Sequence, residues 1–439
     1  MSVAIEVSLL SGESVQVEVE PTHRVHQLRQ KAQTQLQLGI ESLLTASGQT
    51  LCDLDCIAET NLKDGDILTA VCRRGQLISG PESLAFAYRR SDGSVLTWGN
   101  EACGGSSKRV RDQLVDVEQI AANNFAFAAR LSDGSVVTWG EAGKGGNSRH
   151  VRAELTSVVH LEGSTADFAA LRADGRIVCW GSMAPDPVAE SLLDTKQLIA
   201  NSSAFAALSK DGHVACWGLR TSGGYIPTEI AEQLVDVRQL HAGRNCFIAT
   251  RKDGAAVVWG DFQLDRDVPS MADEFRDILE VASTGYAIAL LRADGRVLLL
   301  GSLGAEQEAI ELEEQLTDVQ KIRATCGAFA ALRQSGSVVT WGHKTQGGDS
   351  RKVQEQLQHV QDIYSTNDAF AAIKSDGTIV AWGDGRNGGD SSAVQEQLCQ
   401  IQQVAGSFAA FAALREDGEL ITWGNPGGGG DIHMNDLED

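Results

Sequence analysis

Residues 411–424 read FAALREDGELITWG, and this stretch decides the fold. Two short apolar runs flank the pair Asp417-Gly418, and a tight hairpin turn favours Asp-Gly because it needs residues with positive φ. The second apolar run ends in Trp423-Gly424. The stretch therefore predicts two antiparallel strands joined by an Asp-Gly turn.

The same pattern recurs along most of the chain, and internal repeats determine the whole architecture. All eight tryptophans precede a glycine, and a ninth position holds Leu300-Gly301. Successive positions are 41, 41, 37, 42, 41, 41, 41 and 41 residues apart. We therefore expect nine repeats. Their expected core residues are Trp98, Trp139, Trp180, Trp217, Trp259, Leu300, Trp341, Trp382 and Trp423.

Other positions keep the same spacing. A phenylalanine lies twelve residues before each of these nine positions, except at Ile288, and Asp-Gly lies six residues before, except at Ser335-Gly336. An apolar segment farther upstream, such as Val360 to Ile363, predicts a third strand. Six of the nine repeats also carry Gly-Gly six and seven residues after the tryptophan, which predicts a recurrent turn.

A three-stranded unit cannot bury its own apolar face, so neighbouring units must stack. Each large apolar side chain contributes roughly 1.5–3 kcal/mol when it is fully buried. Stacking of identical units around an axis favours a β-propeller, or an open spiral if the ring does not close. We predict a mainly β, propeller-like array of about nine repeats of about 41 residues.

The repeat resembles that of the regulator of chromosome condensation family (RCC1-like repeats). The resemblance rests on F-A-A-L-x-x-D-G-x-V-x-x-W-G followed by a glycine-rich turn, and it covers residues 76–431. The repeats here are shorter and more numerous than is usual in that family. In their length they are similar to the trimmed blades of a bacterial β-lactamase inhibitory propeller, which implies three strands per blade.

Residues 1–75 follow a different pattern. Apolar residues alternate over 3–7 and 15–19, which predicts a hairpin with one buried face. Apolar residues at helical spacing from Val25 to Leu36 predict an amphipathic helix, with Thr22 as a natural N-cap. Further strands are expected near Leu43 and from Ile67 to Val71. The order is therefore ββαββ.

This order and the motifs V-E-V-E-P, A-S-G-Q-T-L and N-L-K-D-G-D-I-L resemble ubiquitin, and they predict a small α+β ubiquitin-like (β-grasp) domain. The segment ends in Arg73-Arg74-Gly75-Gln76 and runs into the repeats, so we expect that it is not processed and conjugated. The resemblance implies an apolar recognition patch. Its residues would be Leu10, Leu44, Thr45 and Ala70.

The composition excludes several classes of protein. The net charge of −22 argues against nucleic-acid binding and against attraction to an anionic membrane surface. No apolar run is long enough to span a membrane, and Glu6 interrupts the N-terminal apolar stretch, so we expect no signal peptide. The nine cysteines include no C-x-x-C pair, which favours reduced thiols and a cytoplasmic or nuclear location.

We expect no catalytic residue, metal or cofactor. The nine histidines are scattered, and Cys179 and Cys216 fit ordinary strand positions. The glycine run at 427–430 lacks the Lys-Ser/Thr of a phosphate-binding loop and no helix follows it. Each Asp-Gly turn offers one isolated carboxylate, which does not make a calcium site.

The expected function is that of a non-enzymatic protein–protein interaction adaptor with three parts: a ubiquitin-like domain (1–75), a repeat propeller (76–431) and an acidic flexible tail (432–439). The propeller would bind a client protein through the loops after Trp-Gly, and the N-terminal domain would dock to ubiquitin–proteasome components. One alternative, implied by the family resemblance, is nucleotide exchange or regulation of a small GTPase. Another is an accessory or fragment related to propeller-containing ubiquitin ligases. The oligomeric state stays open.

Overall fold

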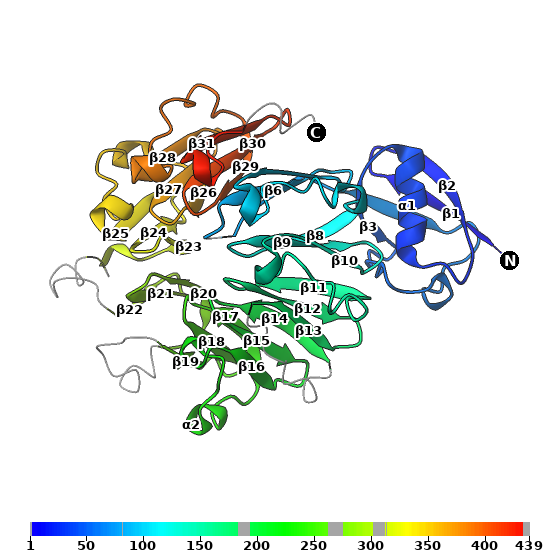
Figure 1. Cartoon of the computed structure of the whole chain (residues 1–439), viewed down its shortest axis with the longest axis horizontal. Helices are drawn as coiled ribbons and strands as arrows, with labels where there is room; N and C mark the ends of the chain where they lie inside the picture. Colours follow the sequence, from blue (N-terminus) through cyan, green and yellow to red (C-terminus); the bar gives the residue numbers. More distant parts are fainter. Residues whose placement is uncertain are drawn as a thin grey trace.

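The computed structural model describes residues 2–80, 82–182, 194–261, 275–301, 312 and 314–432. It contains a small N-terminal α+β module followed by nine three-stranded sheets (Figure 1). The predicted mainly β, propeller-like array is confirmed, as are three strands in each sheet. No helix in these described ranges is long and apolar enough to cross a membrane.

The N-terminal module has the predicted β-grasp arrangement. Its elements are β1 (Val3–Leu9), β2 (Ser14–Val19), α1 (Val25–Leu36), β3 (Ile40–Leu44), the 3-10 turn η1 (Ile57–Glu59) and β4 (Ile67–Cys72). The sheet order is β2-β1-β4-β3, with β1 and β4 parallel. Alternate residues of the strands and one face of α1 form a separate apolar core.

The expected N-cap of this helix is wrong. The helix begins at Val25 and its N-cap is Arg24, whose N–H donates to Gln27 Oε1 at 2.9 Å. A glutamine three residues into the helix satisfies the cap backbone, so the cap does not need a serine or threonine hydroxyl. Thr22 lies in the turn before the helix.

The nine sheets are named blades 1 to 9 in chain order. In each, the first strand pairs antiparallel with the second and the second with the third. Their strands are β5–β7 (Gln76–Ile78, Ala85–Arg89, Val95–Gly99), β8–β10 (Val117–Ala122, Ala126–Leu131, Val136–Gly140), β11–β13 (Val158–Gly163, Asp167–Arg172, Ile177–Gly181), β14–β16 (Thr195–Ala200, Ala204–Ser209, Val214–Gly218), β17–β19 (Val237–Ala242, Cys246–Arg251, Ala256–Gly260), β20–β22 (Ile278–Ser283, Ala287–Arg292, Val297–Gly301), β23–β25 (Val319–Ala324, Ala328–Arg333, Val338–Gly342), β26–β28 (Val360–Ser365, Ala369–Lys374, Ile379–Gly383) and β29–β31 (Ile401–Gly406, Ala410–Arg415, Leu420–Gly424).

Short helical turns connect the strands. The predicted turn after Trp-Gly is a 3-10 turn in most blades, and a four-residue helix, α2 (Thr228–Ala231), follows blade 4. The 3-10 turns are η2 (Glu101–Cys103), η3 (Arg111–Gln113), η4 (Ala142–Lys144), η5 (Arg220–Ser222), η7 (Lys344–Gln346), η8 (Gln354–Gln356), η9 (Gly385–Asn387) and η10 (Pro426–Gly428).

The predicted hairpin is present in every blade. In blade 9, Gly418 adopts φ +90° and the Asp417 carboxylate accepts from the N–H of Glu419 at 3.1 Å, so the Asp-Gly pair itself makes the turn. Phe411 lies directly across from Trp423 in the register, and their rings stack with centroids 5.1 Å apart. The local pattern therefore produces both the turn and the ring pair.

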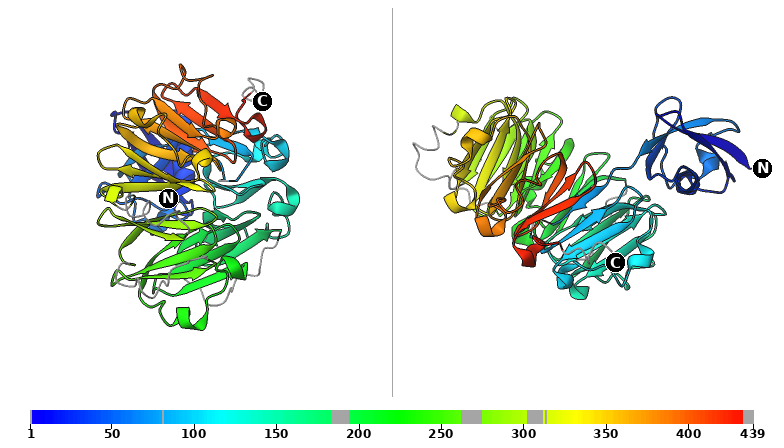
Figure 2. Two further views of the ribbon diagram at one scale, coloured as in Figure 1. Left: turned by 90° about the vertical axis from the view of Figure 1, so that its left-hand side faces the viewer. Right: turned by 90° about the horizontal axis from the view of Figure 1, so that it is seen from above.

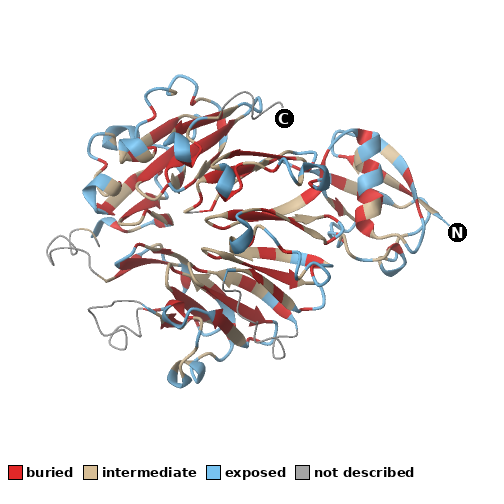
Figure 3. Cartoon of the chain, in the orientation of Figure 1, coloured by how far each residue is buried: buried red, intermediate tan, exposed pale blue. Residues whose placement is uncertain are grey.

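Each apolar cluster of the repeats spans two neighbouring blades. In one of them, Ala328 and Ala330 of blade 7 pack against Phe370 and Trp382 of blade 8. The small alanines on one side leave room for the large rings on the other. Figure 3 shows the buried residues concentrated in the strands and the exposed residues in the connecting loops.

The ring closes. Blade 9 packs against blade 1 in a cluster that contains Ala410, Ala412, Phe86 and Trp98, and Figure 1 shows β29–β31 beside β6. The open spiral is therefore excluded for this structure. The acidic tail expected at 432–439 falls, beyond residue 432, outside the described residues.

Candidate functional site

The tryptophan positions are structural. All eight tryptophans and Leu300 are buried, at 6 % exposure or less, and none of their side chains is presented to a partner. Seven of the eight tryptophans stack on the phenylalanine of the same blade and the eighth, Trp259, is tilted against Phe247. These rings hold blades together and leave binding to the loops.

In six of the nine blades an indole N–H also ties the blade to the one before it. Trp139 Nε1 donates to the carbonyl of Gly104 at 3.0 Å, and Gly104 lies against the ring of Phe127. Within the described part of the chain, Trp217 and Trp341 have a buried Nε1 with no hydrogen-bond partner. Both follow repeats that lack the Gly-Gly pair. The first glycine of the Gly-Gly pair therefore supplies the carbonyl that accepts a hydrogen bond from the next tryptophan.

A second set of turns gathers at the centre of the ring. The turn between the first two strands of a blade begins with a polar residue such as Asn123, whose Oδ1 accepts from the N–H groups of Phe125 and Ala126. Its Nδ2 donates to the carbonyl of Lys144, in the turn after Trp-Gly of the same blade. Serine or threonine has this role in other blades, as at Thr366. A hydrogen bond of this kind joins the central turn to the Trp-Gly turn in blades 2, 4, 7, 8 and 9.

Hydrogen bonds connect the tips of these central turns around the ring. The N–H of Asn124 donates to Thr165 O, that of Asn367 to Phe408 O, and that of Phe408 to Ser83 O. Residues from eight blades line a cavity of about 290 Å³ at this point. Glu82 of blade 1 and Arg244 of blade 5 form an ion pair there. The centre of the ring is therefore a small cavity, lined by hydrogen-bonded turns and containing the Glu82–Arg244 ion pair.

We define the hub face as the central turns together with the turns after Trp-Gly. The sequence-predicted loops lie here, including residues 100–103, 141–144, 219–222, 343–346 and 384–387. Its exposed apolar side chains are Leu219 (49 %), Tyr225 (45 %), Tyr286 (73 %) and Phe408 (36 %). These differ from blade to blade, because the repeat pattern does not constrain the loop tips.

The four residues predicted for the recognition patch of the N-terminal module differ in their exposure. Leu10 is 93 % exposed, and Leu44 and Thr45 are half-buried. Ala70 is 2 % exposed and belongs to the module core, so this assignment is wrong. Strand residues alternate between the two faces of a sheet, and β4 turns Val71, which is 37 % exposed, outward instead. We call Leu10, Leu44 and Val71 the module face.

A buried charged contact, which we call the joint, attaches the module to blade 2. Arg29 of α1 and Arg73 after β4 have fully buried side chains. Arg29 Nη2 lies 2.9 Å from Asp53 in the module and 2.5 Å from Glu118 in β8. Arg73 pairs with Glu118 and lies 3.0 Å from Asp116. Figure 1 shows α1 and β3 of the module beside β8 and β10.

The joint contains more charge than these pairs. Burial lowers the pKa of Arg130 and Arg89, and Glu118 opposes this shift in both. Burial and the neighbouring Arg29 lower the pKa of His26, whose two ring nitrogens are buried without a hydrogen-bond partner. Burial of a charged group is costly unless it is paired, so the two parts are coupled through these contacts.

Sequence reasoning missed the joint, although a signal was present. Glu118 occupies a position that is uncharged or basic in the later repeats, such as Gln361 and Lys196, and Arg130 replaces the leucine of the F-A-A-L pattern. Only blade 2 carries both departures. A charged residue that breaks a repeat at one copy indicates a contact specific to that copy.

The described residues offer little reactive chemistry. They contain no group of three or more His, Cys, Asp or Glu side chains that could hold a metal ion. Burial raises the pKa of the Cys216 and Cys246 thiols to about 12, so both stay protonated at neutral pH. All nine cysteines are free thiols.

No protein-family model and no curated protein matches the chain. Among solved structures, it is similar to Prp20p from Saccharomyces cerevisiae, with 16 % identity over 61 % of this chain and 82 % of that chain and a TM-score of 0.39. It is also similar to the ectodomain of the Arabidopsis thaliana receptor kinase ACR4, with 17 % identity over 61 % and 94 % and a TM-score of 0.36. The N-terminal part is similar to a Caldiarchaeum subterraneum ubiquitin, with 22 % identity over 17 % and 95 % and a TM-score of 0.16.

Proposed function

We propose that the protein is a non-enzymatic adaptor that binds a client protein on the hub face and a ubiquitin–proteasome component on the module face. The observation that carries the proposal is the joint. A flexible tether would let the two faces move independently, whereas buried ion pairs between the module and blade 2 hold both faces at one distance and orientation. A fixed geometry suits a molecule that presents one protein to another.

The character of the two faces supports the division of roles. The hub face combines polar turn groups with exposed aromatic side chains such as Tyr286 and Phe408, and aromatic residues are enriched at protein interfaces. The module face offers a small apolar patch on the outer side of a four-stranded sheet. Neither face is covered by another part of the chain that the structure describes.

Binding of the full-length protein to purified proteasomes tests the module face. We expect the wild-type chain to bind and Leu10→Asp to lose binding about tenfold or more, because a charge would replace an exposed apolar contact. Tyr286→Asp on the hub face is the matched control and should leave proteasome binding unchanged. Equal binding by Leu10→Asp and wild type, or no binding at all, would contradict the docking role.

A panel of small GTPases tests the alternative activity. The adaptor proposal predicts that the full-length protein leaves the rate of nucleotide release unchanged. Catalytic acceleration of release from any member of the panel would replace the adaptor function by nucleotide exchange.

A further inference from the structure

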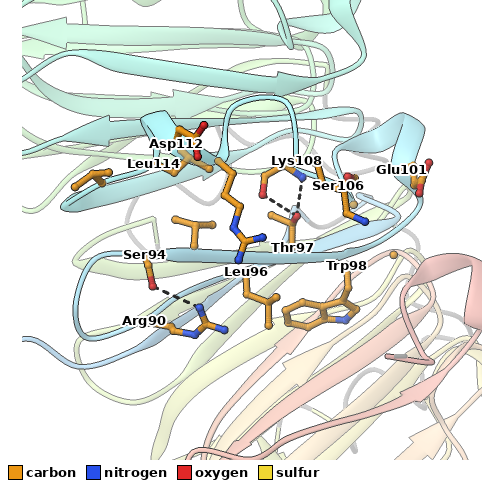
Figure 4. Close-up of a pocket in the computed structure, with 16 residues that line it drawn as sticks. Arg90, Ser94, Leu96, Thr97, Trp98, Glu101, Ser106, Lys108, Asp112 and Leu114 are labelled. Carbon is orange, nitrogen blue, oxygen red and sulfur yellow. Dashed lines mark hydrogen bonds between the residues drawn. The ribbon is translucent and has the colours of Figure 1, made fainter. Parts of the chain in front are cut away.

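The outer strands of blades 1 and 7 are covered by the segments that follow them. A cavity of about 510 Å³ lies between β7 and the segment 105–115, but Thr97 Oγ1 accepts from the Ser107 N–H at 2.9 Å and donates to Ser107 Oγ at 3.2 Å (Figure 4). In blade 7 the amide of Gln354 donates to Val338 O at 3.0 Å. Because these contacts cover the strand edges, the two edges are closed to a further strand. Side chains that project from the inner strands are better placed to bind a partner.

The first strand of blades 2 to 9 has a β-bulge at its second residue. In blade 4, Thr195 pairs with Ser209 and Gln197 pairs with Leu208, so Lys196 between them has no paired residue in β15. A bulge leaves the extra residue unpaired and changes the direction of its side chain. The same register shift occurs in all eight blades. The bulge residues are Glu118, Val159, Lys196, Arg238, Leu279, Gln320, Gln361 and Gln402.

The bulge residues lie at the opposite end of the first strands from the hub face. The central turn follows the last residue of each first strand, as Asn201 follows Ala200 in blade 4, whereas the bulge is the second residue of the strand. In blade 2 the bulge residue is Glu118, which pairs with Arg29 and Arg73 of the module. This repeat position therefore already makes one docking contact in the molecule.

The bulge residues of blades 3 to 6 differ from the glutamine that blades 7 to 9 share. We call these four residues the bulge strip: Val159, Lys196, Arg238 and Leu279. Their strands β11, β14, β17 and β20 are in contact in this order, and Gln197, beside Lys196, donates to Leu240 O of the next blade at 2.8 Å. All four side chains are exposed, Val159 by 38 % and Leu279 by 58 %. The strip therefore runs apolar, basic, basic, apolar across four neighbouring blades, beginning in the blade next to the joint.

The two cations of the bulge strip form no ion pair within the part of the chain that the structure describes. The carboxylates nearest to them in the sequence have other partners: Asp194 lies 3.9 Å from Lys210 Nζ, and Asp236 lies 3.3 Å from Lys252 Nζ. Unpaired, exposed cations on neighbouring strands are a local exception in a chain of net charge −22. An anionic group can therefore bind both cations of the strip without displacing an internal partner.

We propose that the bulge strip binds an acidic segment of a partner protein, whose carboxylates contact Lys196 and Arg238 and whose flanking apolar side chains pack on Val159 and Leu279. Charge-assisted hydrogen bonds orient the segment, and the apolar ends bury surface that is exposed in the free protein. The joint supports this assignment, because an acid at the same bulge position holds the module's arginines in blade 2. The strip is separate from the hub face and the module face, so its failure would leave the adaptor function untouched.

Fluorescence anisotropy of the full chain with two labelled hexapeptides tests the charge selection. The acidic probe is Leu-Asp-Glu-Asp-Glu-Leu, and its uncharged counterpart is Leu-Asn-Gln-Asn-Gln-Leu. We expect the acidic probe to bind about tenfold more tightly, although the net charge of −22 repels it. The double variant Lys196→Gln, Arg238→Gln should weaken its binding about tenfold or more, because both charge-assisted contacts are lost. This variant is expected to fold, because glutamine is native to the bulge position in blades 7 to 9.

The matched control removes the same two charges away from the strip. Lys352→Gln combined with Arg152→Gln changes two exposed side chains of other blades and should bind the acidic probe as wild type does. Leu279→Gln should weaken binding about threefold, because an exposed apolar contact is replaced by an amide. Equal affinity for the two probes, or equal losses in the strip variant and the control, would overturn the proposal. Unchanged affinity in Leu279→Gln would refute the apolar contact.

Discussion

At the scale of single residues, the stability of this protein depends on a three-part contact repeated between blades. A glycine in the left-handed region offers its carbonyl to an indole N–H and its bare Cα to a phenyl ring, as Gly104 does for Trp139 and Phe127. No side chain fits between the backbone and the ring. Where all three are present, glycine, phenylalanine and tryptophan therefore form one contact.

The first prediction concerns Gly104. A Cβ at this position would lie 2.7 Å from Phe127 Cδ2, and φ is +92°, so Gly104→Ala strains the backbone and displaces the ring. We expect a loss of about 2 kcal/mol in the free energy of unfolding, measured by urea denaturation. Gly143→Ala, in the equivalent turn of blade 2, meets nothing within 4 Å and serves as the control. Equal stability of the two variants would contradict this account.

At the scale of elements, the joint makes α1 and blade 2 one unit. The side chains of Arg29 and Arg73 are inaccessible to water, so the free energy of their burial is offset by the carboxylates of Asp53, Asp116 and Glu118 and by hydrogen bonds to the carbonyl of Ile40. Strand alternation acts at the same scale. The exposed residue of β4 is Val71 and not the predicted Ala70, because neighbouring strand residues face opposite sides of the sheet.

The second prediction removes one acid from the joint. Glu118→Ala leaves Arg29 and Arg73 with fewer partners in a buried setting, and we expect a cost of about 3 kcal/mol in the attachment of the module. Hydrogen exchange of the α1 amides should increase, and small-angle scattering should show a larger spread of module positions. Gln361→Ala, at the equivalent exposed position of blade 8, should change neither.

The third prediction is the pH dependence of the joint. The pKa of His26 is held below its ordinary 6.5, first by burial and then by Arg29, so the attached state keeps His26 neutral. A detached or unfolded state binds the proton as the pH falls below about 6.5, and acid therefore favours detachment. For Asp116, burial alone would raise the pKa, but Arg29, Ser132 and Arg73 outweigh it and lower the pKa, so this carboxylate stays ionised through the same range.

Scattering or hydrogen exchange measured from pH 7 to pH 5 checks this dependence. We expect progressive loosening of the module in wild type and a weaker pH response in His26→Gln. The exposed His150→Gln should behave as wild type does. A pH response that survives in His26→Gln would assign the effect to another group.

At the scale of the whole molecule, closure of the ring joins residues from opposite ends of the chain. The amide of Gln403 in blade 9 accepts from Leu77 N–H at 3.2 Å and donates to Gly75 O at 2.6 Å. Trp98 Nε1 donates to Gly429 O at 3.3 Å. Figure 2 shows the N-terminal module projecting from one end of the array of blades. The same glutamine contact joins blades 2 and 3 through Gln119.

The fourth prediction tests closure. Gln403→Ala removes the two hydrogen bonds that this side chain makes across the last interface, and we expect a loss of about 2 kcal/mol in the free energy of unfolding. Amide exchange should increase in blades 1 and 9 together, because each covers the other. Gln402→Ala changes an exposed neighbour in the same strand and should have no effect. Faster exchange in only one of the two blades would argue against a shared interface.

The sequence by itself determined the hairpins, their number, the buried tryptophans and the β-grasp order, because each depends on residues within one repeat or one strand. Turn chemistry and apolar alternation act over a few positions, so they can be read from FAALREDGELITWG alone. The module face was predicted at Leu10 and Leu44 for the same reason. The third residue of the module face, Val71, could be identified only from the strand register of the structure.

Only the tertiary structure decided the closure of nine blades and the joint. Gln403 and Leu77 are 326 residues apart, and Arg73 and Asp116 are 43 apart, so no local pattern specifies that they meet. Their contacts depend on the accumulated rotation of nine stacked sheets and on where that rotation brings the first blade. The physical reason is that packing between units, rather than propensity within them, sets long-range geometry.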